Sequence, residues 1–130
     1  METAKEFIAR KNKEMFSFKT KGKEILMKDI GRHGKHGFER EAWTFLPASN
    51  LKEKKVFIFE RLRKVSHSGK HAYKSSYGGL GELEYRIGYF IVGQIGKAKN
   101  RWIWGQFCPI IPVKDLDRLM KKAKREKTIL

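Results

Sequence analysis

The strictest constraint on the fold comes from a period of two in the apolar residues between Glu82 and Val92. Leu, Tyr, Ile, Tyr and Ile occupy every second position from 83 to 91, so they lie on one face of a β-strand. Gly93 to Asn100 then forms a basic turn, and Arg101 to Cys108 returns as a partner strand. This part of the chain therefore predicts an antiparallel hairpin.

Three earlier segments are expected to extend the sheet: Glu24 to Ile30, Phe38 to Phe45 and Lys55 to Leu62. The third has the clearest strand signal, because Val56-Phe-Ile-Phe59 is β-branched and aromatic. The second alternates acidic with other residues, and a short helix is an alternative there.

Glycine, proline and polar residues separate these segments. Three glycines and no large apolar residue predict a loop from Gly31 to Gly37. Pro47 to Asn50 is expected to be a turn. Arg63 to Gly81 is expected to be a long loop, and structureless loops of this length inside compact domains are usually functional or disordered.

A helix is predicted near each end of the chain. Thr3 and Glu6 have the spacing of a capping box, and apolar residues recur at helical intervals from Ala4 to Phe16. Val113 to Arg125 has an apolar stripe and a basic last turn. Residues 1–130 fit a single domain. We therefore expect one α+β domain, with a twisted, mainly antiparallel sheet or partial β-barrel flanked by an N-terminal and a C-terminal helix.

The charge of the chain is one-sided. Its formal net charge is +16, and residues 55–112 hold three carboxylates against ten lysines and arginines. Self-repulsion of such charge opposes the compact state, so we expect a polyanionic partner. Aromatic residues beside basic ones favour nucleic acid, and RNA or single-stranded DNA over duplex. An acidic protein is the alternative partner for the same surface.

The expected nucleic-acid contacts are of two kinds. Basic side chains are expected to contact phosphates: Arg61, Arg63, Lys64, Lys70, Lys74, Arg86, Lys97, Lys99 and Arg101. Aromatic side chains of the hairpin are expected to stack on a base: Tyr85, Trp102 or Trp104.

The two tryptophans share one face of their strand. That face is either a stacking platform or part of the core, and we expect at least one of Trp102 and Trp104 to be core. Gly88 and Gly105, both within strands, indicate a bulge, a bend or the close approach of a ligand.

All four histidines lie in two similar segments, each with a Gly-Lys-His tripeptide at 34–36 or 69–71. We favour phosphate contact, in which glycine lets the backbone approach and the Lys and His side chains donate hydrogen bonds. A sharper alternative is a metal-independent ribonuclease, with His36 and His71 as base and acid. A metal site is favoured least, because neighbouring cationic side chains repel a divalent ion and no cysteine accompanies the histidines.

Glu60, Glu82 and Glu84 are the three carboxylates of residues 55–112. Two of them in convergence would suit a metal-dependent nuclease, but pairing with nearby arginines is favoured. Glu60 alternates onto the same strand face as Val56, so it is expected to point inward. The sequence has no phosphate-binding loop, dinucleotide motif or paired-cysteine module, and we expect no cofactor and no metal.

Cys108 is the single cysteine, so no intramolecular disulfide can form, which suits a reducing cytoplasm. No secretory signal pattern is present and no apolar stretch approaches the length of a membrane span. The sequence therefore predicts a cytoplasmic nucleic-acid-binding domain, with binding favoured over catalysis.

Overall fold

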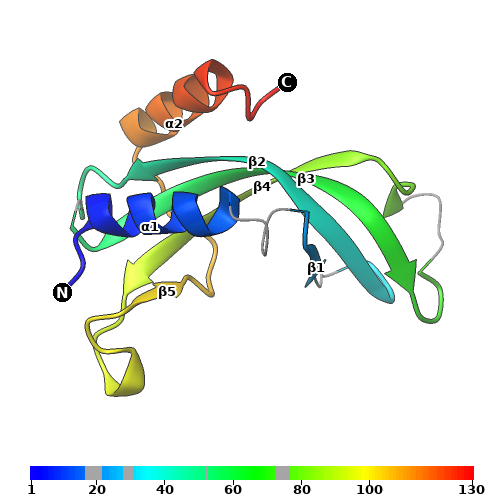
Figure 1. Cartoon of the computed structure of the whole chain (residues 1–130), viewed down its shortest axis with the longest axis horizontal. Coiled ribbons are helices and arrows are strands. Elements are labelled where there is room, and N and C mark those ends of the chain that lie inside the picture. Colours follow the sequence, from blue (N-terminus) through cyan, green and yellow to red (C-terminus); the bar gives the residue numbers. More distant parts are fainter. Residues whose placement is uncertain (17–21, 28–30, 52, 73–76) are drawn as a thin grey trace.

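The computed structural model describes residues 1–16, 22–27, 31–51, 53–72 and 77–130. Within these residues the chain forms two helices and a curled, five-stranded antiparallel sheet, which together make a half-barrel of the α+β class (Figure 1). The predicted fold class is confirmed, including the position of one helix near each end of the chain.

The elements follow one another in the order α1 (Ala4–Phe16), β1 (Glu24–Met27), β2 (Lys35–Pro47), β3 (Lys55–Ser68), β4 (Leu83–Val92), the short 3-10 helix η2 (Gly96–Ala98), β5 (Trp102–Trp104) and α2 (Val113–Arg125). The sheet has the order β1-β2-β3-β4-β5, so each strand pairs with its neighbour in the sequence. All four pairings are antiparallel.

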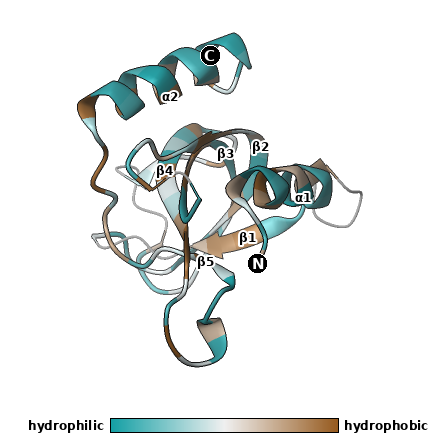
Figure 2. Cartoon of the chain, turned by 90° about the vertical axis from the view of Figure 1, so that its left-hand side faces the viewer, coloured by the Kyte–Doolittle hydropathy of each residue, from teal (hydrophilic) through white to brown (hydrophobic). Residues whose placement is uncertain are grey.

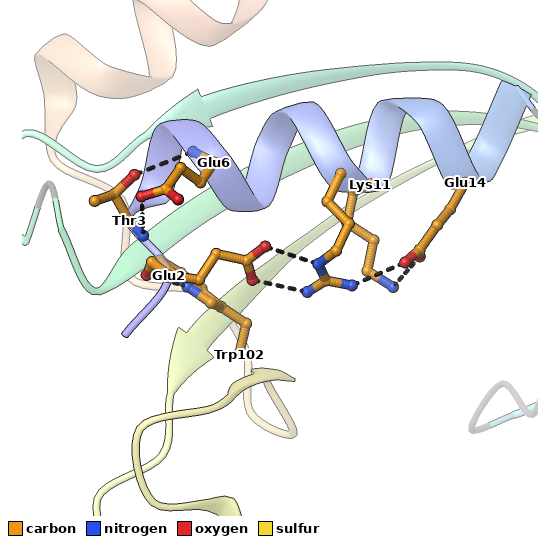
Figure 3. Close-up of polar contacts among 7 residues, drawn as sticks. Glu2, Thr3, Glu6, Lys11, Glu14 and Trp102 are labelled. Carbon is orange, nitrogen blue, oxygen red and sulfur yellow. Dashed lines mark hydrogen bonds and ion pairs between the residues drawn. The ribbon is translucent and has the colours of Figure 1, made fainter.

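Both helices have the predicted bounds. The capping box of α1 is formed: the Thr3 backbone N–H donates to Glu6 Oε1 at 3.3 Å, and the Glu6 N–H donates to Thr3 Oγ1 at 3.1 Å (Figure 3). These two bonds satisfy backbone donors that the first turn of a helix leaves without an intrahelical partner.

The two faces of the sheet are covered by different helices. On the inner face, Phe7 of α1 packs with Phe45, Val56, Ile58 and Phe90. On the outer face, the core consists of residues from the strands and from α2: Leu46, Ala48, Phe57, Phe59, Tyr89, Leu119 and Ala123. This explains why the run 56–59 in β3 is apolar throughout, since its side chains alternate between two buried faces. Figure 2 shows α1 and α2 at separate places around the sheet.

The strand bounds differ from expectation at the end of the sheet away from α1. β2 begins at Lys35 and β3 continues to Ser68, so the expected loops at 31–37 and 63–81 are partly strand. Lys35 pairs with Ser68 and His36 with His67, which makes β2 and β3 one long hairpin. Its backbone pairing persists through two register shifts, at Gly37/Phe38 and Arg40/Ala42.

The two edge strands are shorter than expected. β1 covers Glu24–Met27, and its predicted continuation to Ile30 lies outside the described residues. β5 covers only Trp102–Trp104, so the expectation of a strand reaching Cys108 was wrong. The chain leaves the sheet at Gly105, which lies against the ring of Tyr89.

Candidate nucleic-acid interface

The inner face of the sheet changes character along the strands. Under α1 it is apolar, but farther along β3 the same face carries Glu60, Leu62 and Lys64, with Glu60 and Lys64 almost completely buried. Buried charges are stable only when they are paired or hydrogen-bonded, so each of these side chains requires a partner. We call these two residues and the charged or polar side chains near them the inner charged cluster: Arg32, His36, Arg40, Glu60, Lys64, Glu84 and Arg86.

Glu60 is the centre of this cluster. Its carboxylate accepts hydrogen bonds from Nε of Arg40 on β2 and from Nε of Arg86 on β4, the latter at 2.8 Å. The expectation that Glu60 points inward and pairs with a nearby arginine is confirmed. Glu60 thus links three adjacent strands across the inner face.

Two further members of the cluster are held nearby. Arg32 donates from both terminal nitrogens to the carboxylate of Glu84, and this bond is the main reason why the pKa of Glu84 lies below its usual range, against the opposing effect of burial. The Lys64 ammonium donates to the backbone carbonyls of Tyr77 and Gly78, at 3.4 and 3.0 Å.

A recess of about 250 Å³ opens beside the cluster. Apolar and polar side chains from four segments line it: Met27, Arg32, His36, Phe38, Leu62, Glu84, Tyr85 and Arg86. His36 Nε2 lies 2.9 Å from the carbonyl oxygen of His33, so this nitrogen carries the proton and donates it. In the neutral ring Nδ1 of His36 is then the acceptor, and this atom is buried without a hydrogen-bond partner in the described residues.

The two tryptophans of β5 have different environments. Trp102 stacks on Phe7 with ring centres 4.6 Å apart, so it packs against the core. Its indole N–H donates to the carbonyl of Glu2 at 2.9 Å (Figure 3). Trp104 is 38% exposed, and the guanidinium carbon of Arg86 lies 4.7 Å from its ring centre. Of the two tryptophans, Trp104 is therefore the one whose ring is accessible to a ligand.

Gly88 in β4 and Gly105, which directly follows β5, make room for aromatic rings of the protein itself. A Cβ on Gly88 would overlap with the ring of Trp104, and a Cβ on Gly105 would overlap with the ring of Tyr89. Glycine is therefore needed at both positions because an aromatic ring of the protein lies close to the backbone there.

The basic residues predicted to contact phosphate fall into two environments. Arg61 and Arg63 both donate to the carboxylate of Glu41 on β2, and Lys64 is buried as described above. The remaining described residues of this set, apart from Arg86, are exposed and have no ion pair with any described residue: Lys70, Lys97, Lys99 and Arg101. Lys74 lies outside the described residues.

The Tyr85 side chain also makes contacts within the protein. Its ring is 5.2 Å from that of Phe59, and its hydroxyl accepts a hydrogen bond from the backbone N–H of Leu130 at 3.1 Å. Nearly half of the side chain is exposed, on the outer side of the sheet.

The structure brings the two histidine segments together at the end of the β2–β3 hairpin. His36 is the register partner of His67, and the rings of His33 and His71 are 6.1 Å apart. His36 is 1% exposed whereas His71 is exposed, with a left-handed φ of 61°. No group of three or more His, Cys, Asp or Glu side chains suitable for a metal ion occurs among the described residues.

No family model, curated protein or solved structure matches this chain. The chemistry of the site therefore carries the functional argument. In the part of the chain that the structure describes, no helix has the length and apolar character needed to cross a membrane.

Sequence reasoning missed two members of the inner charged cluster, Arg32 and Arg40. Arg32 lies in a glycine-rich segment, and Arg40 lies next to a register shift that changes the alternation of β2. Arg32 lies outside the strands, so no period of two reaches it. At Arg40 the bulge interrupts the period of two from which the sheet face of a residue is assigned. The inward direction of Glu60 was the one signal that pointed to a charged cluster.

Proposed function

We propose that this protein binds single-stranded nucleic acid, RNA or DNA. The observation that carries the proposal is the way the fold distributes its charge. Five carboxylates, those of Glu2, Glu14, Glu41, Glu60 and Glu84, pair with arginines, whereas many of the excess lysines and arginines are exposed. A surface of this kind attracts a polyanion by releasing the counterions of its phosphates.

The phosphate contacts are assigned to the turn between β4 and β5. Lys97, Lys99 and Arg101 lie on or beside this turn, which projects from the body of the molecule next to β5 (Figure 1). All three side chains are exposed and have no ion-pair partner in the described structure. Their charge is therefore available to a ligand without breaking any described ion pair.

Trp104 supports a single strand over a duplex. Its ring is partly exposed on the edge strand next to this turn, and Arg86 lies against it. Unpaired bases stack on exposed aromatic side chains, whereas bases within a duplex are already stacked on each other. A strand that follows the turn can therefore place a base near Trp104.

The test is the salt dependence of binding to a fluorescently labelled, short oligouridine. If roughly five phosphates are engaged, the logarithm of the binding constant should fall against the logarithm of salt concentration with a slope of about −3 to −5. Fluorescence anisotropy over a salt series measures this slope. No binding at about 50 mM salt would overturn the proposal and favour an acidic protein as the partner.

A matched pair of variants separates the proposed site from general charge. Reversal of Lys97, Lys99 and Arg101 to glutamate should weaken binding much more than reversal of Lys5, Lys13 and Lys23, which are also exposed. Both variants change the net charge by the same amount. Equal losses would mean that attraction is unspecific and that the turn is not the site.

A further inference from the structure

Arg86 has hydrogen-bonding capacity that the fold does not use. Its Nε donates to Glu60, and its Nη1 has the thioether sulfur of Met27 as partner at 3.3 Å. Sulfur is a weak acceptor, and Nη2 has no partner in the described part of the chain. The guanidinium is thus fixed by Glu60 while its terminal nitrogens remain able to donate at the recess that Arg86 lines.

The recess is also lined by a residue of another strand. Met27, which Arg86 contacts, is the register partner of His36, so Arg86 and His36 lie at one site although they come from β4 and β2. Nδ1 of His36 has almost no exposed surface, so a ligand cannot reach it without a shift of the His36 ring. The donors of Arg86 therefore set the polar requirement, and a complementary ligand must present hydrogen-bond acceptors to them.

The shape of the recess further limits the ligand. Phe38 and Leu62 contribute apolar surface, which suits a flat ring more than a bare anion. A volume of about 250 Å³ lies below the range of about 300–1,000 Å³ typical of pockets for drug-sized ligands. The recess therefore suits one ring system with polar edges, such as a single nucleobase.

Among the nucleobases, guanine has this arrangement of groups. Its O6 and N7 are adjacent acceptors that a guanidinium binds with two hydrogen bonds, and its N1–H and 2-amino groups are donors on another edge. Adenine keeps the N7 acceptor but has an amino donor in place of O6, so it would leave one donor of Arg86 unpaired. Cytosine also has two adjacent acceptors, O2 and N3, but its single ring would cover less of the apolar surface of Phe38 and Leu62 than a purine does.

We propose that the recess beside the inner charged cluster receives one unpaired guanine, with Arg86 donating to O6 and N7. This inference rests on the proposed function, because the guanine belongs to the same single strand whose phosphates contact the turn. It adds a base preference that phosphate contact and stacking alone do not provide.

The experiment compares oligouridines that differ only at one central position, which holds uridine, guanosine, adenosine or 7-deazaguanosine. Affinities are measured by fluorescence anisotropy at a single salt concentration. The guanosine strand should bind about tenfold tighter than the uridine and adenosine strands, as expected for one good bidentate contact. The strand with 7-deazaguanosine should lose most of this gain, because it lacks the N7 acceptor.

A variant pair tests the role of Arg86. Arg86→Lys keeps the charge but lacks the two-pronged donor geometry, so it should bind guanosine and adenosine strands equally. Arg101→Lys, an equivalent change at an exposed arginine, should keep the preference for guanosine. If Arg86→Lys does not fold, the comparison of guanosine with 7-deazaguanosine on the unchanged protein decides.

The possible outcomes separate this inference from the proposed function. Equal affinity for the guanosine and adenosine strands, or undiminished affinity for 7-deazaguanosine, would overturn the guanine recess and leave single-strand binding intact. Failure of every strand to bind would remove the proposed function itself.

Discussion

Gly88 shows how the lack of one side chain positions an aromatic ring. The indole of Trp104 occupies the space where a Cβ would stand, and the same ring contacts Arg86. Gly88→Ala should therefore displace Trp104 or strain β4. Forcing extra volume into a packed site typically costs about 1–3 kcal/mol, and we expect a loss of this size in the free energy of unfolding, measured by urea denaturation.

Gly79→Ala is the matched control for Gly88→Ala. A Cβ at Gly79 would meet only Glu82 Oε1, at the ordinary contact distance of 3.7 Å, so little change in stability is expected. Equal stability of the two variants would show that Trp104 moves aside at no cost and that Gly88 does not hold the ring in place.

Glu84 links stability to pH. Because its pKa is lowered in the folded state, mainly by the hydrogen bonds from Arg32, the ionised form stabilises the fold above the unfolded pKa. This contribution is lost as pH falls through the folded pKa. Glu84→Gln should thus be less stable than the unchanged protein at neutral pH, and the difference should shrink between about pH 5 and pH 3.

The measurement is urea denaturation of both proteins over this pH series. Glu82→Gln is the control, since Glu82 is exposed and has no ion pair with a described residue, and it should show little difference at any pH. A constant difference for Glu84→Gln across the series would show that the ion pair with Arg32 contributes no net stability.

The direction of a side chain was predictable from the sequence where the residue lies in a segment with an apolar period of two. The inward direction of Glu60 followed from its alternation with Val56 and Ile58, and burial confirms it. The buried acceptor on His36 was not predictable, because it depends on the carbonyl of His33 and on pairing with β3. A tripeptide with glycine, lysine and histidine indicates a loop by composition, whereas backbone pairing with a distant partner decides the structure.

At the scale of elements, β5 joins the core to the proposed ligand surface. Trp102→Ala removes the ring that stacks on Phe7 and the donor to Glu2, so it should cost about 3–5 kcal/mol of stability, as for a core tryptophan. Trp104→Ala should cost less stability but roughly 1–3 kcal/mol of binding to a single strand. Urea denaturation and fluorescence anisotropy measure the two effects.

The two tryptophan variants serve as controls for each other, because they lie on the same strand face two residues apart. Unchanged affinity after Trp104→Ala in a folded protein would remove base stacking from the proposed function. A small loss of stability after Trp102→Ala would show that the contact between β5 and α1 is dispensable.

Elements with a regular hydrophobic period were predictable from sequence to their ends. Both helices begin and end where expected, since a capping box marks the start of α1 and Pro112 precedes α2. The extension of β3 through Ser68 was not predictable, because its side chains there are polar apart from Val65. In that part of the hairpin, backbone pairing with β2 replaces the apolar alternation that normally indicates a strand.

At the scale of the whole molecule, the net charge of +16 acts on stability and on binding in opposite directions. Salt screens the repulsion among exposed cations, so raising potassium chloride from about 0.05 M to about 0.5 M should raise the melting temperature. The same change should weaken binding to oligouridine. Thermal denaturation and anisotropy in identical buffers measure both trends.

Sucrose at matched osmolality is the control for unspecific effects of the solute on stability. A melting temperature that falls with potassium chloride would mean that the ion pairs of the fold outweigh the repulsion of its excess charge. In that case the basic surface would need no polyanion to offset self-repulsion.

Each strand pairs with its neighbour in the chain, so each pairing of the sheet closes only the one loop between the two strands. During synthesis from the N-terminus, β2 and β3 can therefore pair before β4 is complete. α1 is made first, yet its partner Trp102 comes about a hundred residues later. We expect the first helix of the chain to be among the last elements to complete its packing, and nascent chains that end before β5 to leave exposed the face of Phe7 that stacks on Trp102.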